Sequence, residues 1–197
     1  MFPTNLSELD TWDDDSGTVN VVIETVKGSR NKLKYDADRG VFLLHNVLPE
    51  GSIFPFNFGF IPSTKGDDGD PLDILVLMDE PTVAGCVIPS RLIGVIEAEQ
   101  TEDRKTIRND RILVVAHKCH SHPNVLSIHE MDKYFLKEIE EFFISYHKVH
   151  GQEFRPLGYR GPRRADKLVR KGHKLFTQGD DANGQTPNSK PKKARCK

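Results

Sequence analysis

The first 116 residues contain a series of short β-branched segments separated by turn residues, and few folds accommodate that pattern. Such segments are typical of strands, because branched and aromatic side chains pack well on a pleated surface. The sequence predicts strands over residues 19–24, 32–35, 41–45, 74–77, 86–96 and 111–116. Many short strands joined by turns indicate a barrel or a sandwich.

Two regions depart from this strand pattern. Residues 49–63 hold three prolines and two glycines, and they are predicted to form an irregular segment packed by Phe54, Phe56, Phe58 and Phe60. After residue 126, Ser127 and Glu130 have the spacing of a capping box, and apolar side chains then recur at helical spacing as far as Tyr146. The sequence therefore predicts a helix from Ser127 that stops before Gly151.

The remainder of the chain is basic and then polar. A second helix is predicted over residues 163–176, within a basic stretch that spans residues 155–174. Residues 178–197 show no periodicity and are rich in Gly, Asn, Pro and Lys, which predicts a disordered polar and basic tail. Residues 1–177 are therefore expected to form a single domain of the α+β class, mainly β.

Composition excludes several classes of protein. The formal net charge of −1 gives no general attraction for nucleic acid, so nucleic acid is an unlikely partner. No apolar run reaches the length of a membrane span, so no membrane association is expected. The N-terminus lacks the pattern of a signal peptide, and the three cysteines have no paired spacing. These features predict a cytoplasmic protein.

The most informative segment is the acidic stretch Asp67-Asp68-Gly69-Asp70-Pro71-Leu72-Asp73. Four carboxylates packed closely repel one another unless cations neutralise them, and hard divalent ions with oxygen ligands do so well. A calcium EF-hand does not fit, because Leu72 falls where that loop needs a ligand and Asp73 where it needs glycine. On composition alone, a solvated acidic turn fits equally well.

Residue order favours the metal interpretation. Residues 68–74, Asp-Gly-Asp-Pro-Leu-Asp-Ile, match the motif of the soluble (family I) inorganic pyrophosphatases at every position, and further matching segments follow in order over residues 18–150. The chain resembles a divergent member of that family. The resemblance implies a small closed β-barrel of the OB type flanked by two or more helices, Mg²⁺ (with Mn²⁺ as a substitute), a homo-oligomer, and hydrolysis of inorganic diphosphate by a metal-activated water.

The resemblance also implies roles for individual residues. Asp68 and Asp73 correspond to metal ligands, and Asp70 corresponds to the general base beside the attacking water and to a metal ligand. The substrate-binding positions correspond to Glu24, Lys34, Arg111 and Tyr146. Asn109 stands where the family has a metal-binding aspartate, and the adjacent Asp110 is the alternative ligand from the same hairpin.

Other positions depart from the family pattern. Asn46 replaces an arginine, Phe54 and Phe58 replace tyrosines, and His147 replaces a lysine. Each change removes a charge or a hydrogen-bond donor from the implied phosphate site. Two alternatives therefore stay open: an enzyme that hydrolyses another phosphoanhydride, and a non-catalytic OB-type module that binds polyanions.

Overall fold

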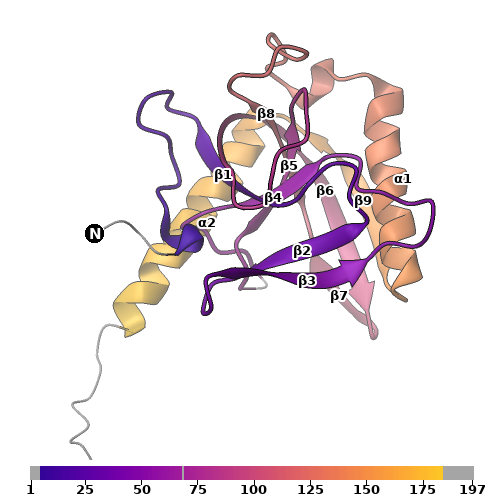
Figure 1. Cartoon of the computed structure of the whole chain (residues 1–197), viewed down its shortest axis with the longest axis horizontal. Helices are drawn as coiled ribbons and strands as arrows, with labels where there is room; N and C mark the ends of the chain where they lie inside the picture. Colours follow the sequence, from indigo (N-terminus) through magenta and orange to yellow (C-terminus); the bar gives the residue numbers. More distant parts are fainter. Residues whose placement is uncertain (1–4, 68, 184–197) are drawn as a thin grey trace, which may run out of the picture.

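The computed structural model describes residues 5–67 and 69–183 (Figure 1). One sheet of seven strands and one hairpin of two strands make up its β-structure. The strands are β1 (Val19–Thr25), β2 (Asn31–Asp36), β3 (Val41–Val47), β4 (Asn57–Ile61), β5 (Leu72–Leu77), β6 (Val87–Glu102), β7 (Lys105–Arg108), β8 (Arg111–Ala116) and β9 (Glu153–Arg160). The α-helices are α1 (Lys133–Val149) and α2 (Pro162–Asn183), with short 3₁₀ helices at Leu6–Glu8 and Ile128–Glu130.

The large sheet closes on itself. Its strands run in the order β1-β4-β5-β8-β6, and β1 pairs with β6 as well as with β4, so that five strands form a ring. Strands β5 and β8 are parallel neighbours, and both are nearly continuous runs of buried apolar residues, as expected where two faces are covered. The expected small closed barrel of mainly β structure is confirmed.

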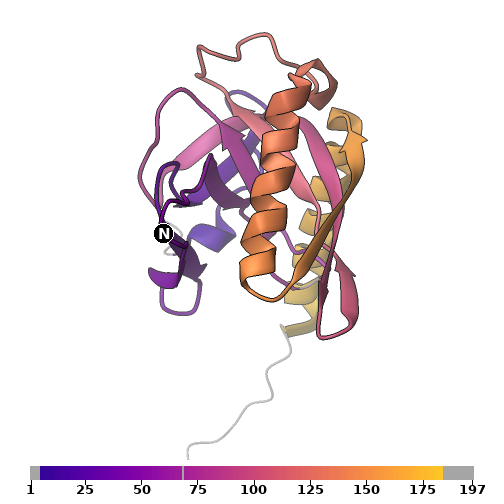
Figure 2. The same ribbon diagram turned by 90° about the vertical axis from the view of Figure 1, so that its right-hand side faces the viewer.

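Helices cover the outside of this barrel. Figure 2 shows α1 running along the barrel with β9 beside it. Leu136, Ile139 and Phe143 of α1 are buried against the core, and so are Ala165 and Val169 of α2. Within the described residues, no helix is long and apolar enough to cross a bilayer.

Part of the segment expected to be irregular is a strand. Residues 57–61 form β4, which pairs with both β1 and β5. Gly59 makes the pairing with β1 possible, because a Cβ atom there would lie 1.9 Å from the carbonyl oxygen of Val22. The alternation of Phe58 and Phe60 is a period-two pattern that the neighbouring prolines obscured.

The ends of two helices also differ from expectation. Ser127 caps the 3₁₀ helix Ile128–Glu130, whereas Asp132 caps α1 by accepting hydrogen bonds from the backbone N–H groups of Tyr134 and Phe135. Aspartate is as good an N-cap as serine, so Asp132 rather than Ser127 marks the start of the α-helix. Helix α2 continues to Asn183, beyond the expected end, because each residue added to an existing helix gains a hydrogen bond. Residues 184–197 of the expected tail lie outside the described residues.

Candidate active site

A cleft of about 520 Å³ lies between the β2–β3 hairpin, the end of β1 and the acidic loop that joins β4 to β5. Figure 1 shows the hairpin in front of the barrel, next to β4. Charged side chains of both signs line the cleft: Glu24, Asp38, Asp70 and Asp73, with Lys32, Lys34 and Lys65, and beside them His45. Such a mixture can hold an anion together with cations.

Helix α2 holds the acidic loop in place. The Lys65 N–H donates to the carbonyl of Gly172 at 3.0 Å, and the Lys171 ammonium pairs with Asp67 at 2.6 Å. A side chain at Gly172 would meet Leu72 at 2.8 Å, so glycine allows the helix to approach the loop closely. Part of the basic stretch of residues 155–174 therefore supports this loop.

Asp70 lies at the mouth of the cleft and faces Lys34 of β2. The Lys34 ammonium donates to Asp70 at 2.6 Å, and both side chains are about half exposed (46% and 58%). Burial opposes the charge of Lys34, but the hydrogen bond and negative charge of Asp70 outweigh it and raise the pKa of the lysine. The pair puts a carboxylate and a cation within reach of one small anion.

Asp73 forms an ion pair with Arg111. The two residues lie at the N-terminal ends of the parallel strands β5 and β8, whose register pairs Ile74 with Ile112. The Arg111 side chain is only 8% exposed, and its guanidinium lies 5.0 Å from the ring centre of Phe143 and 5.9 Å from that of Phe154. A buried, aromatic-flanked arginine keeps its charge and direction fixed.

Glu24 projects from β1 into the same cleft. Its carboxylate accepts a hydrogen bond of 2.7 Å from the backbone N–H of Tyr35. Burial raises the pKa of Glu24 to about 7, and the negative charge of Asp73 adds to that shift. A bound cation between these carboxylates would offset their mutual repulsion.

The donor chemistry fits a hard divalent cation of the Mg²⁺ type. Such an ion keeps several waters and typically takes one or two carboxylates together with substrate phosphates. Asp70 and Asp73 can supply these oxygens, whereas the expected ligand Asp68 lies outside the described residues. Among the residues that the structure describes, no group of three acidic, His or Cys side chains is close enough to hold a metal alone.

The hairpin residues Asn109 and Asp110 lie next to this site but have partners of their own. Both line a small recess of about 80 Å³ together with Asp73 and Arg111. The Asn109 amide donates to the Gln100 side chain. Asp110 accepts the Ala98 N–H at 3.1 Å and the Arg108 guanidinium at 2.7 Å. These contacts hold the base of the β6–β7 hairpin.

Tyr146 does not line the cleft. It lies on α1, where its ring stacks on Phe142 at 6.0 Å, and the Lys32 ammonium lies 5.2 Å from its ring centre. Since Lys32 lines the cleft, this lysine links Tyr146 to the site.

The departures from the family pattern gather at the α1 side of the barrel. Phe54 and Phe58 pack edge to face at 5.1 Å, and both contact Phe142. His147 is buried, stacks on Phe154 at 5.1 Å and hydrogen-bonds to Gln152 at 2.8 Å. Burial and the nearby charge of Arg111 lower the pKa of His147 to about 4. An apolar, uncharged cluster thus occupies these positions.

Sequence reasoning missed several residues of the cleft, among them Lys32, His45 and Lys65. Lys32 could have been found, because residues two apart on a strand share a face and Lys34 was already a candidate. Burial and the charges of Lys32 and Lys34 lower the pKa of His45. Strand β9 was also missed; it pairs with β6 and places Arg155 against Glu99 and Arg160 against Glu97.

Comparisons with known proteins identify the family of this chain. A sequence model described as inorganic pyrophosphatase matches residues 21–177. The inorganic pyrophosphatase of Synechocystis sp. is 41% identical over 145 residues, which cover 74% of this chain and 83% of that protein. The enzyme of Nostoc sp. is 38% identical over 160 residues, which cover 81% and 92% of the two chains.

A solved structure gives the same answer for the fold. The crystal structure of inorganic pyrophosphatase from Thermus thermophilus matches with a TM-score of 0.80 and 31% identity, over 88% of this chain and 99% of that one. The family match in sequence and the match in fold each cover most of this chain. The chain belongs to the inorganic pyrophosphatase family.

Proposed function

We propose that this protein hydrolyses inorganic diphosphate to two phosphates with Mg²⁺, or Mn²⁺ in its place. One observation carries the proposal: two carboxylates, Asp70 and Asp73, share a cleft with three lysines and lie beside a buried arginine. Diphosphate is strongly anionic, so attack by water requires its charge to be neutralised before reaction. A cleft that can hold divalent cations and also supplies fixed cations meets that requirement.

Each side chain then has a defined task. Asp70 at the mouth of the cleft accepts the proton of the attacking water, and Lys34 beside it binds a phosphate oxygen. Asp73, together with Asp68 of the same motif, would hold the metal, which when bound would neutralise phosphate oxygens and lower the pKa of water. Arg111 orients Asp73 and presents a fixed positive charge. Glu24, which also lines the cleft, would accept a hydrogen bond from a water on the metal.

The assay is phosphate release from purified protein with diphosphate, nucleotides and short polyphosphate as substrates, each with and without Mg²⁺. We expect Mg²⁺-dependent release from diphosphate. Release from another phosphoanhydride alone would favour the second enzymatic function, which the apolar positions Phe54 and Phe58 make worth testing. If no substrate releases phosphate across a Mg²⁺ and Mn²⁺ titration, the result would favour the non-catalytic module that binds polyanions.

The proposal also covers the location and the oligomeric state of the enzyme. Cys86 and Cys119 are unpaired thiols, which suits the reducing cytoplasm. Membership of the family suggests a homo-oligomer. Light scattering coupled to size exclusion would measure the mass in solution, and a mass equal to that of one 22.3 kDa chain would contradict this part of the proposal.

A further inference from the structure

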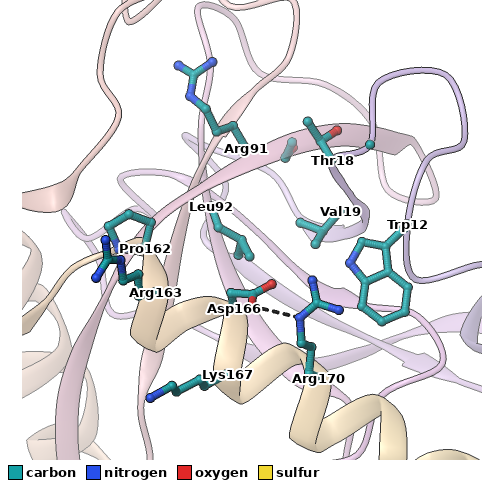
Figure 3. Close-up of a pocket in the computed structure, with 12 residues that line it drawn as sticks. Trp12, Thr18, Val19, Arg91, Leu92, Pro162, Arg163, Asp166, Lys167 and Arg170 are labelled. Atoms are coloured by element: carbon teal, nitrogen blue, oxygen red, sulfur yellow. Dashed lines mark hydrogen bonds and ion pairs between the residues drawn. The ribbon is translucent and has the colours of Figure 1, made fainter.

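A second cleft, of about 560 Å³, lies between the N-terminal loop, β6 and the first turns of α2 (Figure 3). It shares no lining residue with the active-site cleft. Its volume falls within the range of ligand-binding pockets, which is about 300–1,000 Å³. The site therefore needs an explanation that the proposed function does not supply.

The floor and one wall of this cleft are apolar. Val19, which is almost fully buried, and Leu92 form the floor, and Pro162 lies at the start of α2. Trp12 forms the opposite wall and is joined to Val19 by an isolated backbone bridge. Figure 3 shows the indole at the edge of the cleft, on the side away from Pro162. The Arg170 guanidinium, which also lines the cleft, lies over the indole, so a flat group would pack against Trp12 and Arg170 together.

Trp12 is held firmly in this position. The hydroxyl of the preceding residue, Thr11, donates to the carbonyl of Pro62 at 3.0 Å. The ring of His173 meets the indole edge to face at 4.9 Å, and the Arg170 guanidinium lies 5.6 Å from the indole centre. A wall that is already ordered loses little entropy when a ligand binds.

The rim is strongly basic in a protein whose net charge is −1. Four cations line the cleft, against one carboxylate, and that carboxylate, Asp166, pairs with Arg170 at 2.8 Å. Arg91 donates to backbone carbonyls, which leave its charge uncompensated. Among the side chains that the structure describes, those of residues 5–67 and 69–178, no carboxylate pairs with Arg163 or Lys167. Helix α2 also has no acidic residue in its first turn.

We propose that this cleft binds an organic phosphate, with its phosphate on Arg163 and Lys167 and its flat body against Trp12. Nucleotides are the common class of metabolite that has both parts. Arginine pairs well with phosphate oxygens, and bases stack on aromatic side chains. A bare phosphate would leave the apolar wall unused, and an uncharged aromatic molecule would leave the cations unused.

Trp12 is the only tryptophan of the chain, so its fluorescence reports on this cleft directly. We expect ATP to change the emission in a saturable way, and adenosine and inorganic phosphate to act far more weakly. The double variant Arg163→Ala/Lys167→Ala should weaken ATP binding by about tenfold or more, because two charge-assisted contacts are lost. The control Lys27→Ala/Lys133→Ala removes two exposed lysines outside both clefts and should leave binding unchanged.

Four results would overturn the proposal. They are the absence of a saturable response to ATP, an affinity that the Arg163→Ala/Lys167→Ala variant retains, an equal response to adenosine, and an equal response to inorganic phosphate. A response that saturating methylenediphosphonate abolishes would also do so, because this non-hydrolysable diphosphate should occupy the active-site cleft. None of these readouts depends on turnover, so the result is independent of the proposed hydrolysis.

Discussion

Arg111 lies beside Asp73 at the start of two parallel strands, and its guanidinium pairs with that carboxylate from a nearly buried position. The Arg111 guanidinium beside Asp73 has two opposite effects on the proposed reaction. It contributes positive charge near the substrate, and it competes with any metal ion that binds the same carboxylate.

Arg111→Met separates these effects. We expect the Mg²⁺ concentration for half-maximal rate to fall, because Asp73 loses its competing partner, while the turnover number falls by about tenfold or more with the loss of a transition-state cation. Phosphate release over a Mg²⁺ titration measures both. Thermal unfolding should change little, because the carboxylate left without its partner, Asp73, is 55% exposed and stays hydrated. Arg155→Met, which removes a surface partner of Glu99, is the matched control; an unchanged Mg²⁺ requirement in Arg111→Met would contradict the competition.

Asp70→Asn tests the general base. Loss of a positioned base typically costs on the order of 10²–10⁴-fold in rate, and the side chain is exposed, so the melting temperature should stay constant. Asp67→Asn makes the same chemical change three residues earlier, at a carboxylate paired with Lys171, and should keep most of the activity. Equal turnover in the two variants would remove Asp70 from the proposed role.

The hairpin beside Asp73 has lost a charge if Asn109 stands at a metal position. Asn109→Asp should lower the Mg²⁺ requirement, because a carboxylate attracts a divalent cation more strongly than an amide does. Asp110→Asn should leave that requirement unchanged and lower the melting temperature, because Asp110 accepts hydrogen bonds from Ala98 and Arg108. Metal titration and thermal melts of both variants give the answer. A sharp rise in the Mg²⁺ requirement of Asp110→Asn would instead make Asp110 the metal ligand.

His147 should make stability depend on pH. Its pKa is about 4 in the folded protein, below the ordinary value of 6.5, so the unfolded chain binds the proton more readily. The contribution of neutral His147 to the free energy of unfolding is therefore complete above pH 6.5. It is lost as the pH falls towards 4, by an amount on the order of 3 kcal/mol. Urea unfolding of wild type and His147→Gln at several pH values measures this. The variant should lose less stability on acidification, and the exposed control His129→Gln should behave like wild type. Parallel curves for wild type and His147→Gln would rule the effect out.

Gly59 should tolerate no side chain. A Cβ atom at this position would overlap the carbonyl of Val22, so Gly59→Ala must push β4 away from β1 and open the barrel. We expect a loss of several kcal/mol in unfolding free energy, which is large for one methyl group. Gly161→Ala is the control, since its Cβ would meet nothing closer than 3.6 Å. Chemical denaturation of both variants makes the comparison, and equal midpoints would mean that the two strands adjust without cost.

Much of the barrel could be predicted from the sequence, because its signals are local. The β-branched runs at β1, β5 and β8 and the helical spacing in α1 depend on side chains that are near one another in the chain. Strand β9 was not predictable in this way. Its residues pair with β6 through cross-strand contacts such as Arg155 with Glu99, and partners so far apart in sequence leave no periodic signal.

The residues of the site were also predictable only where their signal is local in the sequence. Asp70 and Asp73 could be located because they belong to one continuous motif, whereas Lys65 and Phe176 enter the cleft only because α2 docks on the acidic loop. Tyr146 was expected at the substrate, yet its contact with the cleft passes through Lys32. That expectation came from the family resemblance, which gives the order of residues along the chain and not the distances between elements of this fold.

Strand β6 pairs with four others, and its two ends have different partners. Residues 87–96 pair with β1 and β8 and close the ring, whereas residues 97–102 extend past the ring and pair with strands β7 and β9. The projecting end can therefore be shortened, lengthened or exchanged without reopening the closed wall. The recess beside Asp73 is lined by Arg108, Asn109 and Asp110, where the hairpin's second strand returns to the barrel. Exchanging this hairpin for those of relatives should therefore change the metal requirement of the proposed reaction while the barrel beneath stays intact.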